Sequence, residues 1–281
     1  MTTPSPYDDP VPRGWKLVQG TLRVTVALQC AGMAAAHLHG QVDSPVFDLL
    51  QTYYEIPESA LPQAQDIAAY AFAAAAVLTL LRPCWAVLLP VILWIAASAA
   101  ALAVDEDNVI AAIEHTVRVA APVVLLLVDF WPPRLDFSIG RAKIAMGLLQ
   151  IAIIVSLGAH SLMLLRECGS LGEYASAIER ASSVLPGGPA TSAQLAQGLA
   201  VAFAMDVLLA AGLLLSRSRP ILLIAVCWGV VLAALPLAAS GPAVYYESLI
   251  RAAGTGAPLA LLCYWLFAVK DQPSIIVPGR S

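Results

Sequence analysis

Charged residues are scarce in this chain of 281 residues, because Asp, Glu, Lys and Arg make up 12% of it, against about 25% in an ordinary soluble domain. Hydrophobic residues make up 59% and aromatic residues only 7%, so the apolar excess consists of Ala, Leu and Val. A water-soluble domain of this length buries roughly 75% of its surface, too little to hide so many apolar side chains. The same composition excludes intrinsic disorder. Of the classes considered, a polytopic membrane protein is the one that fits this composition.

Basic residues and paired cysteines are also few. Lys plus Arg number 15 against 19 Asp plus Glu, so nucleic acid is not an expected partner. The five cysteines include no Cys-x-x-Cys pair, which argues against a thiol-redox or zinc module. No Walker loop, dinucleotide fingerprint or nucleophile motif is present. Whether the chain is an enzyme is therefore open, and the absence of such motifs favours a protein that is not one.

Eight apolar segments are long enough for helices across hydrocarbon about 30 Å thick, which requires roughly 20 residues. They are 21–39, 67–82, 84–104, 116–131, 143–165, 196–216, 220–240 and 249–269. The expected fold class is therefore all-α, an integral membrane protein with eight transmembrane helices. In the two longest loops, FDLLQTYY and YASAIERASS are candidates for short surface helices.

The distribution of Lys and Arg predicts the orientation. Eleven of the 15 basic residues fall on one side of an eight-span topology, whereas Arg118, Arg166, Arg180 and Arg251 fall on the other. The expected location is the cell membrane, with both termini cytoplasmic and the lipid bilayer as the surroundings.

The two halves of the chain share a series of marker residues, which indicates an internal repeat. The matched markers are Gln29 and His39 with Gln150 and His160, Phe72 with Phe203, Arg82-Pro83 with Arg219-Pro220, Trp94 with Trp228, Glu114 and Arg118 with Glu247 and Arg251, and Trp131 with Trp265. Four helices per unit insert in the same orientation, so the repeats are parallel. The predicted organisation is a tail at 1–20, four-helix repeats at 21–135 and 140–270, and a tail at 271–281.

This order of helices and loops resembles the DoxX-like membrane proteins, which are four-helix units with a long first loop. The resemblance covers the layout of both halves and includes no diagnostic motif, and the duplication departs from the single-unit pattern. It implies a bacterial accessory protein linked to quinones or respiration, with a membrane redox partner. No catalytic residue is carried over by position.

Polar residues within the apolar segments are candidates for a site, because they are costly in hydrocarbon. Each Glu-x3-Arg pair, Glu114 with Arg118 and Glu247 with Arg251, is spaced to form a local ion pair or to present its Arg to a shared outer cavity. Gln29 with His39 and Gln150 with His160 either line one face or form hydrogen bonds between helices. No metal-ligand spacing occurs, so no metal is predicted. The symmetry of His39 and His160 leaves haem open.

Asp206 is the most isolated ionisable residue, in the middle of the sixth segment, where its repeat counterpart is Ala75. It is expected to face the bundle interior and to be protonated unless it meets a cation. Gln150 and Ser156 are its expected partners. A proton relay and a packing hydrogen bond are equally compatible with this position.

Three functions stay open at this point. The first is a DoxX-like accessory protein that binds a quinone or another lipid-soluble small molecule. The second is a small-molecule or proton-coupled transporter that uses Asp206. The third is a structural or assembly factor without a ligand.

Overall fold

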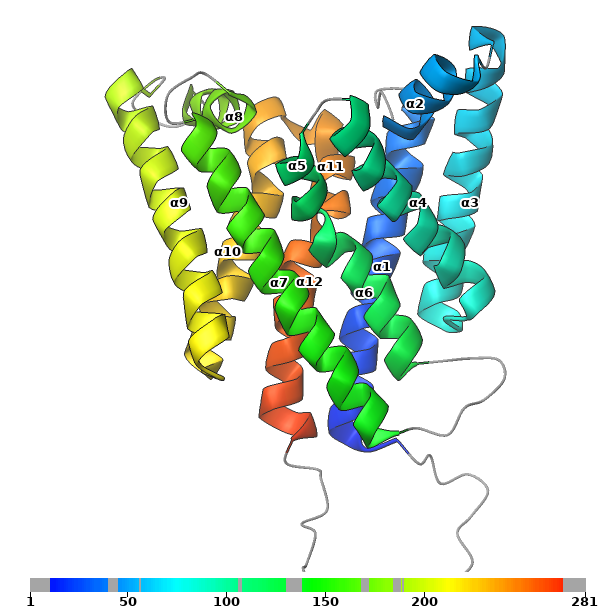
Figure 1. The fold of residues 1–281 in the computed structure, drawn as a ribbon, viewed down its shortest axis with the longest axis vertical. Helices are drawn as coiled ribbons and strands as arrows, with labels where there is room; N and C mark the ends of the chain where they lie inside the picture. Colours follow the sequence, from blue (N-terminus) through cyan, green and yellow to red (C-terminus); the bar gives the residue numbers. More distant parts are fainter. Residues whose placement is uncertain are drawn as a thin grey trace, which may run out of the picture.

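The computed structural model describes residues 11–39, 45–55, 57–105, 108–129, 138–167, 172–183, 188 and 190–269. This described part is all-helical and contains no strand. The long helices stand side by side, two short helices lie across one end, and the described chain ends lie at the other (Figure 1). The predicted tail at 271–281 lies outside the described residues. Of the predicted tail at 1–20, residues 13–20 instead begin the first helix.

The helices follow one another in the same order twice. The first series is α1 (Arg13–Leu38), α2 (Pro45–Tyr54), α3 (Leu61–Leu81), α4 (Trp85–Asp105), α5 (Val109–Glu114) and α6 (Thr116–Val128). The second is α7 (Ile139–Glu167), α8 (Glu173–Ser183), α9 (Ser192–Leu215), α10 (Arg219–Ser240), α11 (Tyr245–Ile250) and α12 (Ala252–Cys263). A π-helical segment, Tyr264–Ala268, continues α12. The two surface helices expected from the long loops are confirmed as α2 and α8.

Six helices are long and apolar enough to cross a membrane, or seven if the bent pair α11–α12 counts as one span. The chain is therefore a multi-pass membrane protein. Eight spans were expected, and α1 is the helix that falls short by apolarity. It carries Arg23, Gln29 and His37 along its length, and its neighbours cover much of it, so that Trp15 and Leu22 are fully buried.

A break lies just before the fourth expected segment, 116–131, and another lies within the eighth, 249–269. α5 and α6 meet at His115, and α11 and α12 meet at Arg251, where the two parts are bent by 45°. Each break lies seven residues before a helix proline, Pro122 and Pro258. Each proline removes the hydrogen bond to the carbonyl four residues before it, at Arg118 and at Gly254, so it weakens the turn that follows the break. The breaks lie inside the bundle, where side chains from other helices can satisfy the freed backbone groups.

Small residues bring the central helices into backbone contact. A Cβ on Gly32 of α1 would lie 2.6 Å from the Ile250 nitrogen, and a Cβ on Gly229 of α10 would lie 2.4 Å from the Gly254 oxygen. Such approaches are typical of membrane helices, whose association depends on close packing. They hold the broken helices in the middle of the bundle.

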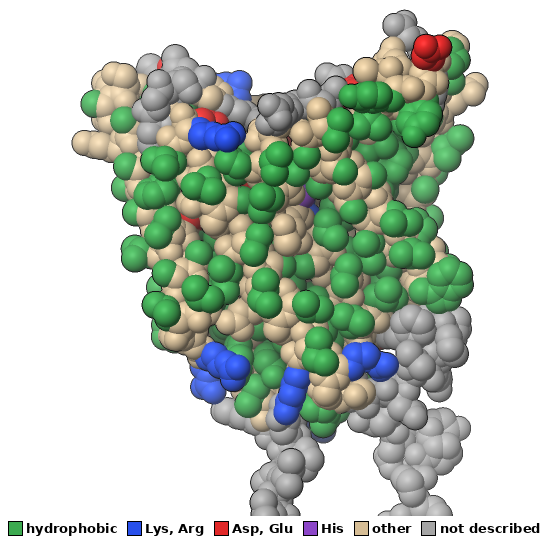
Figure 2. Space-filling model, in the orientation of Figure 1, with side chains coloured by type: hydrophobic (Ala, Val, Ile, Leu, Met, Phe, Trp, Pro, Cys, Tyr) green, Lys and Arg blue, Asp and Glu red, His purple; other side chains and the backbone are tan. Residues whose placement is uncertain are grey.

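The surface in Figure 2 is a broad apolar band, with Lys and Arg side chains gathered mainly at the end that carries the described chain ends. Exposed side chains such as Leu208, Leu223 and Ile151 belong to this apolar surface. A surface of this kind suits contact with lipid rather than with water.

Candidate functional site

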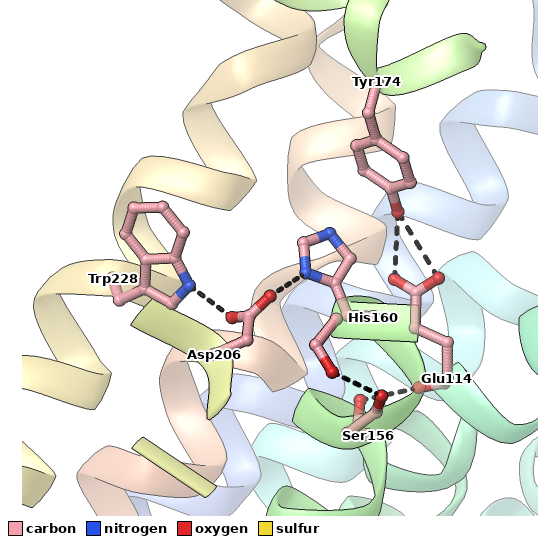
Figure 3. Close-up of polar contacts among 8 residues, drawn as sticks. Glu114, Ser156, His160, Tyr174, Asp206 and Trp228 are labelled. Carbon is pink, nitrogen blue, oxygen red and sulfur yellow. Dashed lines mark hydrogen bonds and ion pairs between the residues drawn. The ribbon is translucent and has the colours of Figure 1, made fainter. Parts of the chain in front are cut away.

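A buried Asp–His–Trp chain links three helices of the second half. Asp206 on α9 is fully buried. Its Oδ2 lies 2.5 Å from Nδ1 of His160 on α7, and its Oδ1 accepts a hydrogen bond of 2.7 Å from Nε1 of Trp228 on α10 (Figure 3). Each carboxyl oxygen therefore has a polar partner. The pair with His160 is an ion pair whenever the imidazole is protonated.

The expected partners of this carboxyl, Gln150 and Ser156, bond elsewhere. Gln150 donates from Nε2 to the Leu213 carbonyl, and Ser156 donates from Oγ to the Glu114 carbonyl, each at 2.7 Å. The actual partner, His160, lies one helical turn beyond Ser156 on α7. Which residue of α7 lies opposite Asp206 depends on how α7 and α9 pack against each other. The position of each residue along its own helix does not predict this pairing.

Tyr174 of the surface helix α8 covers the site from the end of the bundle opposite the described chain ends. Its hydroxyl donates to the Glu114 carboxylate, at 3.2 and 3.4 Å from the two oxygens. Its ring meets the imidazole of His160 edge-on, with centroids 4.8 Å apart (Figure 3). The Glu167 carboxylate accepts hydrogen bonds from the backbone nitrogens of Tyr174 and Ala175. Since these are free donors at the start of a helix, this contact holds α8 in place.

A cavity of about 80 Å³ lies beside this chain of contacts. Its polar lining consists of Glu114, Arg118, Ser156, His160, Trp228 and Arg251. The remaining walls are aliphatic side chains, Pro258 and two glycines from α6, α7, α10 and α12. Because one water needs roughly 10–15 Å³ on such a measure, the cavity has room for a small polar group or several waters. Both halves of the chain contribute to it.

Two guanidinium groups face the single carboxylate at this cavity. Arg118 Nη1 lies 2.9 Å from His115 Nε2, and the Arg118 carbonyl accepts a bond from Gln29 Nε2 at 3.4 Å. The Arg251 side chain forms no hydrogen bond or ion pair within the part of the chain that the structure describes. Both arginines act electrostatically on Glu114. Among the side chains that line the cavity, two guanidinium groups therefore accompany one carboxylate, so the lining carries more charged donors than charged acceptors.

Neither Glu-x3-Arg pair closes a local ion pair among the described residues. Glu114 and Arg118 lie on opposite sides of the break at His115, and Glu247 and Arg251 lie on either side of the end of α11. The spacing of one turn brings side chains together only on a continuous helix. Arg251 lies at the break between α11 and α12, as His115 lies at the break between α5 and α6, whereas Arg118 lies three residues beyond its break.

The other residues singled out from the sequence lie apart from this cavity. Gln29 is fully buried, bonds to the Arg118 carbonyl and does not line the cavity. His39 is exposed, bonds through Nδ1 to a carbonyl of its own helix and contacts the ring of Tyr246. Gln150 lines a different pocket, and Glu247 does not line the cavity. Of the residues singled out from the sequence, the structure therefore brings four together at the cavity, namely Glu114, Arg118, His160 and Arg251.

The first half carries a similar group of side chains without the carboxyl. His37 on α1 stacks on Phe72 of α3, with centroids 6.0 Å apart, and meets Phe47 of α2 and Trp94 of α4 edge-on. Its Nδ1 is buried and has no hydrogen-bond partner among the described residues. This cluster is packed as aromatic core.

Sequence reasoning missed Tyr174 and the pairing of His160 with Asp206. A signal for Tyr174 was present, because it stands at the start of the surface helix expected in the second long loop. Its aromatic ring and hydroxyl suit a boundary between water and hydrocarbon. Trp228 was noticed as a repeat marker, but its role as a donor follows only from the three-dimensional arrangement.

Among the described residues, no group of three or more His, Cys, Asp or Glu is placed to hold a metal ion. His39 and His160, the residues that left haem open, belong to different clusters. Comparison with models of known families, with curated proteins and with solved structures found no match to this chain.

Proposed function

We propose that this membrane protein binds a lipid-soluble small molecule of the quinone class, with one carbonyl end of the ring in the cavity beside His160. The observation that carries this proposal is the surplus of hydrogen-bond donors at an otherwise apolar cavity. Arg251 has no side-chain partner among the described residues, and Arg118 and His160 line the same cavity. A quinone ring is apolar on its faces and carries only acceptors at its carbonyls, so it complements such a lining.

His160 is the residue that would exchange a proton with the bound molecule. Its Nδ1 is tied to Asp206, so Nε2 is the nitrogen available to a ligand. A carboxylate behind an imidazole fixes its orientation and stabilises its protonated form. His160 would therefore donate to a carbonyl oxygen or accept from a hydroxyl, as oxidised and reduced ligands require.

The architecture that supports this proposal is a pair of parallel four-helix repeats, with α1 and the bent pair α11–α12 as the remaining two of eight spans. The helix contacts recur in the two halves. Helix α1 packs against α3, α6, α11 and α12, and α7 packs against α9, α12, α5 and α6. Each broken helix thus lies against the long helix of the other half. Because each half contributes a broken helix to the other half, a site between the two parallel repeats is expected.

The side of the membrane and the wider role belong to the same proposal. The end with the described chain ends carries most of the basic residues, which favours cytoplasmic termini in the cell membrane. The cavity would then open toward the outer leaflet. A DoxX-like accessory role beside a membrane redox partner is consistent with quinone binding.

A binding assay with a short-chain quinone tests the proposal. The wild-type protein in detergent is expected to bind it, and Arg251→Gln is expected to weaken binding about tenfold or more, since a charge-assisted hydrogen bond contributes about 1.5–3 kcal/mol. His37→Phe, in the aromatic cluster of the first half, is the matched control and should bind as the wild type does. Equal affinity in all three proteins would overturn the proposal.

A proton-coupled transporter is the second candidate, and the Tyr174–Glu114 contact favours it. This contact covers the cavity from the outer end and is a natural gate. In proteoliposomes with a pH-sensitive dye, transport would depend on Asp206, and Asp206→Asn would abolish it while the protein stays folded. Ligand binding without any proton movement would favour the first candidate.

A further inference from the structure

A second pocket lies at the opposite end of the bundle, near the described chain ends. Its volume is about 300 Å³. Lys143 and Gln150 of α7 form one wall, and Tyr264 and Trp265 form another. Arg217, in the turn between α9 and α10, completes it. These residues play no part in the cavity beside His160.

The pocket is positively charged. Lys143 and Arg217 are exposed, and neither forms an ion pair with any residue that the structure describes. The guanidinium of Arg217 lies over the ring of Trp265, 5.1 Å from its centroid, which holds it in position. Arg219 donates from Nη2 to the Trp265 carbonyl at 3.3 Å, so a third cation stands nearby. No Asp or Glu of the described residues lines the pocket.

Apolar side chains surround these cations. Ile144 is 66% exposed directly after Lys143, and Leu214 and Leu215 are 70% and 85% exposed just before the turn with Arg217. A site for a free inorganic anion has no need of such neighbours. A site for a lipid needs apolar neighbours, because the acyl chains must lie along apolar surface beside the headgroup.

We infer that this pocket binds the phosphate of an anionic phospholipid. Lys143 and Arg217 would donate to the phosphate oxygens, and the acyl chains would run over the exposed faces of α7 and α9. Basic pockets between transmembrane helices on the cytoplasmic side are suited to such headgroups. Phosphate as the ligand group also follows from the donors, because guanidinium and ammonium groups form strong charge-assisted bonds with it.

Native mass spectrometry of the whole protein, loaded from micelles with phosphatidylglycerol or phosphatidylcholine, tests the inference. The wild-type protein is expected to retain phosphatidylglycerol in preference to phosphatidylcholine. The double variant Lys143→Gln/Arg217→Gln should lose roughly thirtyfold in affinity for phosphatidylglycerol, since each basic residue near the surface contributes about a factor of five. Both positions are exposed, so the double variant should unfold at the same temperature as the wild type.

Arg82→Gln removes one charge in the turn between α3 and α4, outside the pocket, and should retain the lipid as the wild type does. Inorganic phosphate at millimolar concentration should not displace the bound lipid. Unchanged retention in the double variant would overturn the inference. So would binding of inorganic phosphate without any binding of phosphatidylglycerol. None of these results depends on quinone binding at the other cavity.

Discussion

The His37 cluster and the His160 cluster occupy matching places in the two halves of the molecule. Each histidine lies toward the C-terminal end of a long helix, α1 or α7, and contacts an aromatic residue of the following surface helix. His37 contacts Phe47, Phe72 and Trp94, which come from α2, α3 and α4. His160 contacts Tyr174 of α8 and Asp206 of α9, and Trp228 of α10 joins this cluster through Asp206.

The difference between the two clusters lies in their polar groups. The imidazole of His37 contacts the ring of Phe72, whereas that of His160 contacts the carboxyl group of Asp206. The surface helix α2 contributes Phe47, which has no polar group on its ring, to the first cluster. The surface helix α8 contributes Tyr174, whose hydroxyl bonds to Glu114, to the second. The same arrangement of helices therefore holds an aromatic core in one half and a connected polar network in the other. In a low-dielectric interior such a network is rigid when every member is paired and costly when one is removed. Matched substitutions in the two clusters can measure this difference.

The largest difference is expected for the two histidines. His160→Phe leaves a carboxyl oxygen of Asp206 unpaired in the interior and should lower the free energy of unfolding by about 3–5 kcal/mol. His37→Phe removes a ring whose Nδ1 has no partner among the described residues, so its effect should stay within about 1 kcal/mol. Unfolding in mixed micelles, followed by circular dichroism, measures both.

His160→Gln is the control for the histidine comparison, because its amide keeps a polar group near Asp206 and should restore part of the lost stability. If His160→Phe and His37→Phe cost the same, the contact with Asp206 contributes nothing and the comparison between the clusters fails.

The two tryptophans should differ by less. Trp228→Phe and Trp94→Phe remove similar aromatic area, but Trp228 also donates a hydrogen bond to a carboxyl group. The excess loss for Trp228→Phe should be about 1.5–3 kcal/mol if Asp206 is ionised, and about 1 kcal/mol if it is neutral. The same unfolding assay therefore also reports the charge state of Asp206. If Trp228→Phe lowers the free energy of unfolding no more than Trp94→Phe does, the hydrogen bond between Trp228 and Asp206 is contradicted.

The smallest effect is expected at the surface helices. Tyr174→Phe removes one long hydrogen bond to Glu114 and should cost about 1 kcal/mol, because the ring stays in contact with His160. The reverse change, Phe47→Tyr, adds a hydroxyl to the aromatic cluster of the first half and should give no stabilisation. Hydrogen exchange of α8 should become faster in Tyr174→Phe. Unchanged exchange there would show that Tyr174 does not hold α8 over the cavity.

Several residues of the site are recognisable in the amino-acid sequence. Glu114, Arg118, His160, Arg251 and Asp206 stand out because ionisable groups are rare in apolar segments, and four of these five line one cavity. The fifth, Asp206, is joined to the cavity through its contact with His160. Rarity identifies such residues one at a time, but it does not say which of them meet.

Composition and hydropathy determined the membrane class, the all-helical fold, the approximate helix ends and the surface helices α2 and α8. These properties follow from the local balance between apolar side chains and backbone hydrogen bonds. Only the tertiary structure decided the breaks at His115 and Arg251, the absence of the Glu-x3-Arg ion pairs among the described residues, and the meeting of Asp206 with His160. These features depend on how helices distant in sequence are aligned, and that alignment is decided by the packing of the whole bundle.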